Sequence, residues 1–467
     1  MDIEEFDLLV VGGGKAGKSL AMDLARSGRS VAMVERTMIG GTCINVACIP
    51  TKTIINSGRV LTTARRAAEF GIAGVESPRL DINLLRQRKE HVVDSMVEGQ
   101  LAAFTDSGMD FILGEATFVG ERTVDVELHD GGRRTLRGAD VVVNLGTEPL
   151  IPAIPGLADS AVQTSNTFLR LEKLPASIIV LGGGYVGCEF ADLLNGFGVK
   201  VTIVQRGTHL LVREDQDVSD TIQQRFTDAG INLRLGEAAE LVSRAPDGTV
   251  SVALSSGAIV TAEDILVAVG RIPMTAGLNL EEAGIRLTDS GFIEVDEYLR
   301  TSAEHVWAAG DAAGSPQFTH ASYDDYRVLK ANLAAQDRES GPQRSTVGRL
   351  VPYCVFVTPE LGRVGLTERE ARAAGYRVRV ARMPVSVIPR ARTLGHLEGI
   401  WKAVIDRDTN LILGVSLLGT EASEAIAVVQ MAMLGGLEYT AVRDAVITHP
   451  TIAEGLNLLF TPAYLEA

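Results

Sequence analysis

Two cysteines, Cys43 and Cys48, are the residues best suited to chemistry in this sequence. They lie five positions apart in the segment GGTCINVACIPTK, after a glycine pair and before a Pro-Thr-Lys step. Such a pair could ligate a metal ion, form a structural disulfide or act as a redox-active dithiol. The rest of the chain must decide among these three chemistries.

A second reactive pair lies near the C-terminus, in the segment VITHPTIAEGLNLLF. His449 is followed five residues later by Glu454. Taken alone, His449 would be interpreted as a capping or packed histidine. An imidazole oriented by a carboxylate is also a common base for thiols. If the two cysteines form a redox-active dithiol, we therefore assign His449 and Glu454 to acid–base catalysis.

The cysteine count argues against a metal site and against a structural disulfide. The chain has 4 cysteines. Cys188 falls within a predicted helix and Cys354 within an apolar strand, where we expect small buried thiols. A tetrahedral zinc site would need two further ligands at suitable spacing, and disulfide-stabilised secreted folds are short and richer in cysteine.

Helix geometry restricts how Cys43 and Cys48 can meet. In a regular helix, Cα atoms five residues apart are about 8 to 9 Å apart, whereas a disulfide needs less than about 7 Å. The two can bridge only across a distorted turn, which Pro50 can bound. A bridge of this kind favours redox activity over a structural role, and a nearby helix N-terminus would lower a thiol pKa.

The N-terminal segment FDLLVVGGGKAGKSLAMDLARSGRSVAMVERT predicts a strand, a glycine turn, a helix and a second strand. Leu8 to Val11 form the apolar strand, Gly12, Gly14 and Gly17 give the pattern G-x-G-x-x-G, and Glu35 ends the second strand. Glycines allow a pyrophosphate to approach a helix N-terminus, and an acid about 20 residues further on binds a ribose. The segment predicts a dinucleotide site.

The same pattern returns in ASIIVLGGGYVGCEFADLLNGFGVKVTIVQRG, with Gly182, Gly184 and Gly187. Two such patterns indicate two dinucleotides. The second copy ends its strand with Gln205 and Arg206 instead of an acid. Without a carboxylate, a 2′-phosphate is not repelled, and Arg206, together with Arg213, could pair with it. We therefore expect NADPH to be preferred over NADH.

Composition limits the class of protein. The chain has 467 residues, of which 46% are hydrophobic and 22% charged, and 48 are glycine. This composition is typical of an α/β enzyme with several domains. A net charge of -15 without a basic cluster disfavours nucleic acid as a partner. No apolar run is long enough for a membrane span, and the acidic N-terminus is unlike a signal peptide, so we expect a cytoplasmic protein.

Changes along the sequence in the pattern of predicted strands and helices indicate the order of the domains. We expect a first nucleotide-binding domain in residues 1–147, a second nucleotide-binding domain in 148–270, a return to the first domain in 271–345, and a separate α+β domain in 346–467. The segment RESGPQRSTVG, residues 338–348, is predicted as a linker. In the last domain, Thr367 and Glu370 fit a helix capping box. The fold class is α/β, with two Rossmann-like domains.

The full set of motifs resembles one family. The segment GGTCINVACIPTK, the two glycine patterns, VWAAGD and HPTIAE together resemble the FAD-dependent pyridine nucleotide-disulfide oxidoreductases of class I. Lipoamide dehydrogenase, glutathione reductase and mercuric reductase belong to this family. The resemblance covers nearly the whole chain. It implies that residues 1–147 and 271–345 form the FAD-binding and central domain, that 148–270 bind NAD(P)H, and that 346–467 form the dimerisation domain. It also implies a homodimer in which each active site is shared between subunits.

The resemblance also implies roles for the reactive residues. Cys48 matches the thiol that faces the flavin, and Cys43 matches the thiol that exchanges electrons with substrate. Lys52 and Glu189 match the pair beside the flavin and the nicotinamide. His449 and Glu454 match the acid–base dyad that the second subunit contributes.

Further positions match cofactor contacts of the family. Tyr185 matches the tyrosine that gates the nicotinamide pocket, Glu35 the contact to the FAD ribose, and Asp311 the contact to the flavin ribitol. The remaining positions assigned to cofactor binding are Gly41, Thr42, Ala116, Gly146, Gly270 and Gly310.

Several short segments resemble particular subgroups of the family and indicate which kind of electron acceptor to expect. KAGKSLA, DDYRVLK and VIPRAR resemble the bacterial reactive-chlorine-resistance reductases, which reduce copper(II), and VTIVQRGTHLLVRED is similar to the mercuric reductases, which use NADPH. We therefore expect a disulfide or a metal ion such as Cu(II) or Hg(II) as acceptor. The ending FTPAYLEA has no vicinal cysteine pair, which argues against efficient reduction of mercuric ion. Ala47 stands where the family usually has glycine.

Two alternatives stay open. Dihydrolipoamide dehydrogenase is the nearest enzymatic one, because the dyad of His449 and Glu454 suits dithiol oxidation, although Gln205 and Arg206 argue against its usual NAD. The other is a non-catalytic metal-binding or redox-sensing protein, which two complete nucleotide patterns disfavour.

Overall fold

The computed structural model describes residues 2–170, 172–336 and 344–466. Contacts divide the chain into two compact units, each made of segments distant in sequence. The first unit comprises Met1–Ile54, Asp81–Leu150 and Gly270–Arg349, and the second comprises Ile55–Leu80, Ile151–Val269 and Leu350–Ala467. Each unit is described by itself below.

The first unit is built on a mixed sheet. Strands β1, β2 and β3 run parallel in the order β3-β2-β1, β1 pairs parallel with β5, and β5 pairs parallel with β16. Strand β4 pairs antiparallel with both β3 and β5. A separate antiparallel ribbon joins β6 to β15. The bounds are β1 Ile3–Val11, β2 Val31–Glu35, β3 Asp110–Gly120, β4 Thr123–Leu128, β5 Arg133–Val143, β6 Thr147–Pro149, β15 Arg271–Pro273 and β16 Val306–Ala308.

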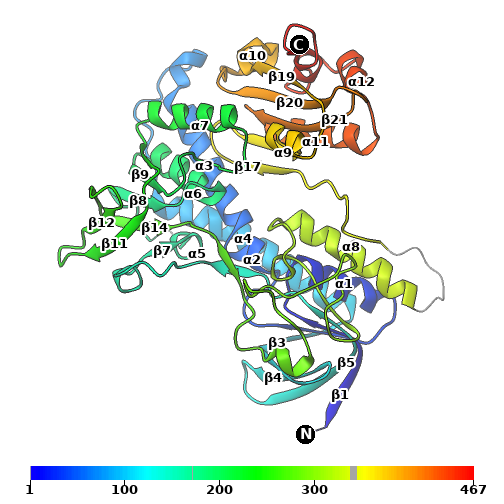
Figure 1. Cartoon of the computed structure of the whole chain (residues 1–467). Helices are drawn as coiled ribbons and strands as arrows, with labels where there is room; N and C mark the ends of the chain where they lie inside the picture. Colours follow the sequence, from blue (N-terminus) through cyan, green and yellow to red (C-terminus); the bar gives the residue numbers. More distant parts are fainter. Residues whose placement is uncertain (1, 171, 337–343, 467) are drawn as a thin grey trace. The chain divides into compact units, whose positions relative to one another are not determined.

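Helices cover this sheet because its central strands are apolar on both faces. In β1, Leu8 and Val10 enter one core cluster, and Leu9 and Val11 enter another, as the alternation of side chains along a strand requires. The first cluster includes residues of α1 and α8, which lie side by side (Figure 1). The bounds are α1 Lys15–Arg26, α2 Thr42–Asn45, α3 Cys48–Arg65, α4 Ile82–Ser107, η3 Leu280–Ala283, η4 Asp311–Ala313 and α8 Thr319–Gln336.

The second unit contains a parallel sheet, a three-stranded ribbon and an antiparallel sheet. Their strand orders are β10-β9-β8-β14-β7, β11-β12-β13 and β17-β18-β21-β20-β19. The bounds are β7 Gln163–Thr164, β8 Ser177–Leu181, β9 Lys200–Gln205, β10 Asn232–Leu235, β11 Ala239–Arg244, β12 Val250–Leu254, β13 Ile259–Ala262, β14 Asp264–Val267, β17 Tyr353–Val355, β18 Leu361–Gly365, β19 Val378–Pro384, β20 Ile400–Asp406 and β21 Ile412–Leu418.

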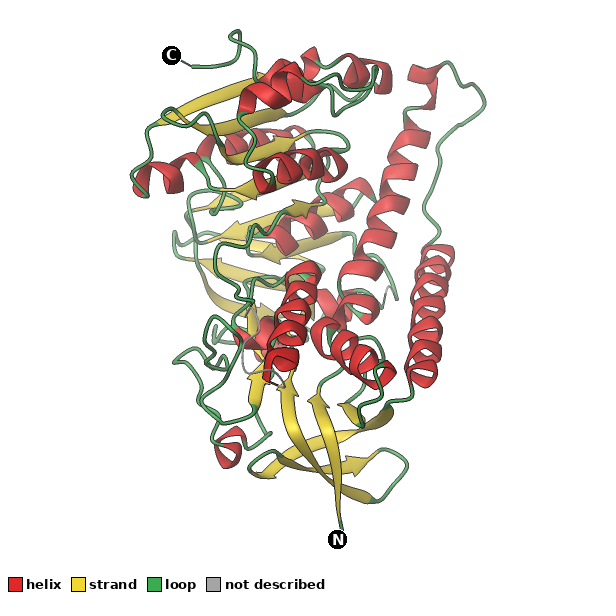
Figure 2. Cartoon of the chain, turned by 90° about the vertical axis from the view of Figure 1, so that its right-hand side faces the viewer, coloured by secondary structure: helices red, strands yellow, loops and turns green. Residues whose placement is uncertain are grey.

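Helices of the second unit pack on both of its sheets, and Figure 2 shows the C-terminal strands as a layer with helices against it. Trp401, fully buried, lies in a core formed by β19–β21 and by helices α11 to α13. The bounds are η1 Ala67–Phe70, η2 Ala158–Ser160, α5 Ser165–Phe168, α6 Tyr185–Gly196, α7 Gln216–Asp228, α9 Glu368–Ala373, η5 Val385–Val387, α10 Pro389–Leu394, α11 Ala422–Leu434, α12 Tyr439–Asp444 and α13 Gly455–Leu459.

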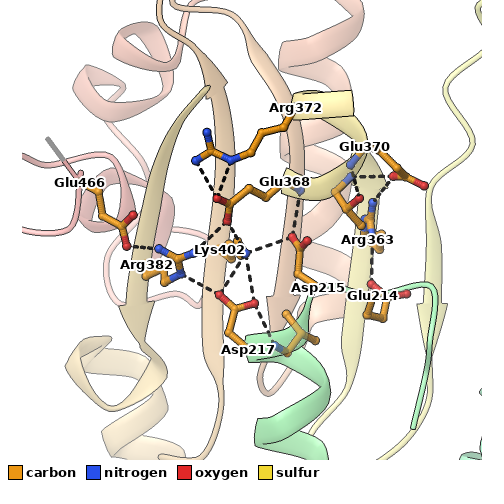
Figure 3. Close-up of polar contacts among 12 residues, drawn as sticks. Glu214, Asp215, Asp217, Arg363, Glu368, Glu370, Arg372, Arg382, Lys402 and Glu466 are labelled. Carbon is orange, nitrogen blue, oxygen red and sulfur yellow. Dashed lines mark hydrogen bonds and ion pairs between the residues drawn. The ribbon is translucent and has the colours of Figure 1, made fainter. Parts of the chain in front are cut away.

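A buried lysine joins α7 to the antiparallel sheet of the second unit. The Lys402 ammonium lies 3.2 Å from an oxygen of Asp215, 3.0 Å from one of Asp217 and 2.9 Å from one of Glu368 (Figure 3). Only 4% of the Lys402 side chain is exposed. Arg382 adds ion pairs to Asp217 and Glu368. Because each buried charge has several partners, this cluster fixes the start of α7 against β19, β20 and α9.

Several sequence predictions are confirmed. Strand β1 contains Leu8 to Val11, β2 ends at Glu35 and β9 ends at Gln205. Thr367 and Glu370 form the predicted capping box at the start of α9. Among the described residues, no helix combines the length and apolar character that crossing a membrane requires.

Other expectations differ from the structure or fall outside it. The segment VWAAGD predicts a strand that ends at Gly310 and Asp311, whereas strand β16 ends at Ala308, because the chain turns at Gly310 with a positive φ of 71°. Cys354 is only half-buried, not fully buried, since it lies on the edge strand β17. Of the predicted linker, residues 338–343 lie outside the described residues. The four-part domain division stays a prediction.

Candidate active site

The first glycine pattern forms a tight turn between β1 and α1. Gly12 has a φ of 98°, and a Cβ on it would lie 2.5 Å from the carbonyl oxygen of Asn144. A Cβ on Gly17 would lie 2.7 Å from the Gly12 carbonyl oxygen. Gly14 caps α1 without a side-chain hydrogen bond. The Ala16 and Gly17 amides of the first helical turn donate to Ser322 and Asn144, so an anion would approach the glycine turn ahead of them. These residues therefore fit the FAD pyrophosphate.

Glu35 is fixed at the end of β2 by backbone amides. Its Oε2 accepts a hydrogen bond from the Gly13 amide at 2.7 Å, and its Oε1 accepts from the amides of Thr37 and Met38, both at 2.9 Å. Three donors hold the carboxylate beside the glycine turn. The position suits the predicted contact with the FAD ribose.

The second glycine pattern repeats this arrangement with one change. Gly182 has a φ of 105°, and the Gly183 amide donates a hydrogen bond to Oε1 of Gln205 at 3.0 Å. Gln205 thus occupies the position of Glu35 without its negative charge. Arg206 and Arg213 are exposed, and neither has an ion-pair partner among the described residues. Both guanidinium groups are therefore available to an anion.

The cysteine pair lies where one short helix ends and a long one begins. Cys43 belongs to α2, and Cys48 is the first residue of α3. Between them, Val46 has a φ of -141° and ψ of 17°, so the helix is interrupted. This interruption is the distorted turn that a bridge across five residues requires. The two cysteines are thiols that are not joined in a disulfide, and both are half-buried.

The two thiols have different environments. A hydrogen bond with Cys48, and then burial, raise the pKa of Cys43, against which Thr319 and the charge of Lys18 act. The Sγ atom of Cys48 lies 3.7 Å from Oγ1 of Thr319. Cys48 also lies at the N-terminus of the 18-residue helix α3, whose dipole favours a thiolate. The raised pKa of Cys43 means that its thiolate form is disfavoured in this structure.

A buried lysine lies close to this pair. Lys18, in α1, is 4% exposed, and its Nζ donates to the Gly40 carbonyl at 2.8 Å. Burial, together with the charge of Lys15, lowers the pKa of Lys18 to about 8, and Cys43 opposes that shift. The ammonium therefore adds positive charge near the segment that carries Cys43.

Asp311 is oriented by a short chain of hydrogen bonds. Nε of Arg271 donates to the Thr147 hydroxyl at 2.8 Å, and that hydroxyl donates to Oδ2 of Asp311 at 2.8 Å. Burial raises the pKa of Asp311, although the bond from Thr147 and the charge of Arg271 oppose the shift. The adjacent Gly310 amide donates to Asp325 at 2.7 Å.

His449 and Glu454 meet in the second unit. Nδ1 of His449 lies 2.7 Å from Oε2 of Glu454. The His449 side chain is 68% exposed, whereas Glu454 is 12% exposed. Glu454 thus orients one ring nitrogen and leaves the other, Nε2, directed to solvent or to a partner. This geometry fits an acid–base dyad.

The remaining predicted residues are distributed over both units. Glu189, in α6, is 6% exposed and accepts a hydrogen bond from the Phe356 amide at 2.8 Å. Lys52, in α3, belongs to the first unit and Glu189 to the second. Tyr185 is the first residue of α6. The other predicted cofactor positions are found as follows: Gly41 and Thr42 at the start of α2, Ala116 in β3, Gly146 after β5, Gly184 and Gly187 at the start of α6, and Gly270 before β15.

Sequence reasoning missed several residues that shape the site. Asn144 accepts a hydrogen bond from the Gly17 amide at 3.0 Å and donates to the Ala309 carbonyl at 2.7 Å. Thr319 contacts Cys48 although 271 positions separate them. Arg271 and Thr147 support Asp311. Of these residues, only Asn144 could have been recognised in the sequence, because it interrupts the apolar run VVVNLG two residues before a glycine.

Comparison with known proteins shows the family of this chain. Residues 6–325 match the family model for pyridine nucleotide-disulphide oxidoreductases, and residues 351–459 match the dimerisation domain of the same family. The chain therefore belongs to the pyridine nucleotide-disulphide oxidoreductase family. It is an FAD-dependent oxidoreductase that uses a pyridine nucleotide, and its dimerisation domain supports a homodimer.

Individual relatives align with almost the whole of this chain. The chain is 37% identical to the probable pyridine nucleotide-disulfide oxidoreductase RclA of Escherichia coli, covering 98% of this chain and 99% of that protein. The solved structure of RclA, described as a Cu(II) complex of a HOCl-induced flavoprotein disulfide reductase, matches with a TM-score of 0.89. A mercuric reductase of Bacillus cereus is 32% identical over 97% of this chain and 71% of its own. A dihydrolipoyl dehydrogenase of Halobacterium salinarum is 33% identical, over 96% of this chain and 94% of its own.

Proposed function

We propose that this protein passes electrons from NADPH, through FAD, to the Cys43–Cys48 disulfide and from there to a metal ion or a disulfide. Cu(II) is the first candidate acceptor. The observation that carries the proposal is the pair itself. Two thiols in hydrogen-bond contact lie across an interrupted helix, and one of them is at the N-terminus of α3.

The residues of the first unit would hold FAD. Gly12, Gly14 and Gly17 would receive the pyrophosphate, Glu35 the ribose and Asp311 the ribitol. Bound FAD supplies a two-electron relay between a nicotinamide and the cysteine pair. The net first half-reaction consumes NADPH and one proton and converts the disulfide into two thiols, releasing NADP⁺.

The second half-reaction returns the pair to the disulfide. With copper as acceptor, two Cu(II) ions take one electron each, the Cys43–Cys48 bond forms, and two Cu(I) ions and two protons leave. Soft thiolate ligands favour Cu(I), which supports copper as an acceptor. The solved RclA relative carries Cu(II) in its complex, and this similarity supports the same choice for the present chain.

The raised pKa of Cys43 explains why a base is needed. A thiol that stays neutral must lose its proton before it can attack a disulfide, because the thiolate is the nucleophile. We assign that proton transfer to His449, oriented by Glu454 and contributed by the second subunit. Lys52 and Glu189 are assigned to the nicotinamide side of the site.

One acceptor panel tests the proposal. The FAD-loaded protein would be supplied with NADPH and, separately, with NADH, and offered Cu(II), Hg(II), lipoamide, glutathione disulfide or oxygen. We expect Cu(I) formation, followed with a Cu(I)-specific chelator, to be fastest with NADPH. A protein that binds no FAD, or that reduces none of these acceptors, would refute the proposed function.

Dihydrolipoyl dehydrogenase activity is the second candidate. The 2.7 Å contact between His449 and Glu454 favours it, because that reaction needs a base to deprotonate a dithiol substrate. The halobacterial relative also has this activity in its name. In the panel, NAD⁺-dependent oxidation of dihydrolipoamide faster than NADPH-dependent Cu(II) reduction would favour this candidate.

A further inference from the structure

The first residue of α6, Tyr185, is held by its hydroxyl group. It follows Gly184, which caps the helix at the second glycine pattern. The Tyr185 hydroxyl lies 3.0 Å from Oε1 of Glu214 and 3.0 Å from the hydroxyl of Tyr353. The two tyrosine rings are in contact, with centroids 5.3 Å apart and planes inclined by 38°. Tyr185 is therefore anchored at both its ring and its hydroxyl.

Glu214 is the centre of this anchor. Its side chain is fully buried, and Oε1 also accepts a hydrogen bond from the Tyr353 hydroxyl at 2.6 Å. Its Oε2 is paired with Nη1 of Arg363 at 2.9 Å, and the Arg363 side chain is 4% exposed. Arg363 is fixed in turn by the Gly365 carbonyl and by Glu370, as Figure 3 shows for the ion pairs. A buried carboxylate with this many donors is held in one position.

The protons in this cluster can be assigned. Burial, followed by the negative charge of Glu214, raises the pKa of both Tyr185 and Tyr353, so both are neutral donors. The short contact between Tyr353 and Glu214 shows that the Tyr353 hydroxyl donates its hydrogen bond to Glu214. The Tyr185 hydroxyl shares its own proton between Glu214 and the oxygen of Tyr353.

The anchor leaves the helix N-terminus open. Gly184 and Val186, on either side of Tyr185, are exposed, whereas Tyr185 is partly buried against Tyr353. The backbone amides that would receive a pyrophosphate are thus accessible while the tyrosine ring is held to one side. Tyr353 comes from β17 and Glu214 from the segment before α7, so two separate parts of the second unit hold the ring.

We propose that Glu214 and Tyr353 are positioning residues that hold Tyr185 away from the mouth of the second dinucleotide site and thereby set its affinity for NADP(H). This inference rests on the proposed function, because it takes that site to bind NADPH. Without the anchor, the ring becomes free to cover the helix N-terminus, and a bound nucleotide must displace it. One lost hydrogen bond of about 1 kcal/mol corresponds to about a 5-fold change in dissociation constant.

Equilibrium binding of NADP⁺ to the FAD-loaded protein tests the proposal. Isothermal titration calorimetry should give a dissociation constant about 3- to 10-fold higher for Tyr353→Phe than for the wild type. The matched control is Tyr439→Phe, which removes the hydroxyl of another buried tyrosine in the second unit, one bonded to Arg379 at 3.3 Å. Its dissociation constant should equal that of the wild type.

A second variant separates positioning from a general loss of structure. If the unanchored ring obstructs the site, removing the ring relieves the obstruction, so Tyr185→Ala combined with Tyr353→Phe should bind NADP⁺ more tightly than Tyr353→Phe alone. An unchanged or lower dissociation constant for Tyr353→Phe would overturn the proposal, as would a double variant that binds no better than Tyr353→Phe. Failure of the wild type to bind NADP⁺ would instead refute the proposed function, and this inference with it.

Discussion

The Gly183 amide donates a hydrogen bond to Oε1 of Gln205 at 3.0 Å, as the Gly13 amide donates to Oε2 of Glu35 at 2.7 Å in the first glycine pattern. The two dinucleotide turns therefore use the same support, and they differ in one charge. Because Gln205 keeps the hydrogen bond and lacks the carboxylate, the second site can accept a 2′-phosphate without repulsion.

Gln205→Glu should change the preference between nucleotides. The new carboxylate can still accept the Gly183 amide, but it repels a 2′-phosphate and can bind a free ribose hydroxyl. We expect kcat/KM for NADPH to fall about 10-fold or more and that for NADH to rise. Steady-state kinetics with both nucleotides would measure the ratio of the two kcat/KM values. The comparison is Arg206→Ala, which should lower kcat/KM for NADPH and leave that for NADH unchanged. An unchanged ratio would refute the argument.

Cys43→Ser should separate the two half-reactions. The variant retains both nucleotide sites, so NADPH should still bleach the flavin absorbance, but transfer to Cu(II) or to a disulfide should be lost. Rapid-mixing spectroscopy without oxygen would measure the first step, and acceptor assays the second. The control is Cys354→Ser, on the edge strand β17, which should behave as the wild type. Full acceptor reduction by Cys43→Ser would show that Cys43 is not the outlet thiol.

His449→Gln should slow reactions that require proton transfer more than reactions that do not. General acid–base catalysis contributes roughly 10²- to 10⁴-fold, so thiol–disulfide exchange should fall by about that factor. Reduction of Cu(II), which takes electrons singly, should fall less. Glu454→Gln, which still reaches Nδ1 of His449, should give an intermediate loss. Equal losses for disulfide and metal acceptors would contradict the acid–base assignment.

Lys402→Met should destabilise the protein and make its stability depend less on pH in the acid range. Burial alone would raise the pKa of Asp217 and of Glu368, but hydrogen bonds and charge from Lys402 and its neighbouring arginines lower both. Carboxyl groups with lowered folded pKa values contribute stability above their unfolded values, near pH 4, and lose it as pH falls through the folded values. Breaking such a buried cluster costs about 3 to 5 kcal/mol.

Thermal unfolding from pH 7 down to pH 3 would measure both effects. The midpoint of Lys402→Met should be lower at pH 7 and should approach that of the wild type as the carboxyl groups become protonated. Lys173→Met is the matched control, because the Lys173–Glu263 pair is on the surface and should matter little. If the wild type and Lys402→Met differed by the same amount at every pH, the cluster would not act through these carboxyl groups.

The local parts of the site could be predicted from the sequence because they depend on short-range rules. Glycine spacing after an apolar strand predicted the turn at Gly12. The change from apolar to polar residues correctly placed Glu35 and Gln205 at strand ends. The capping box at Thr367 is equally local. Helix geometry also predicted that Cys43 and Cys48 could form a bridge only across an irregular turn, and Val46 interrupts the helix there.

The contacts that could not be predicted join segments far apart in the chain. Thr319 and Cys48 are an example, as are Tyr353 and Tyr185, which are 168 positions apart. Nothing in their local sequence indicates a partner, because tertiary packing alone brings them together. The clusters around Glu214 and Lys402 were missed for the same reason, although each involves buried charges that are costly unless paired.

Electron uptake by the FAD-loaded protein tests the central claim most directly. An anaerobic dithionite titration, followed by visible absorbance, should consume about four electrons per FAD in the wild type, two for the flavin and two for the Cys43–Cys48 disulfide. At the midpoint, a long-wavelength thiolate–flavin band should develop, and the variant Cys43→Ser should take up only about two electrons. Uptake of only two electrons by the oxidised wild type, with no such band, would contradict the account.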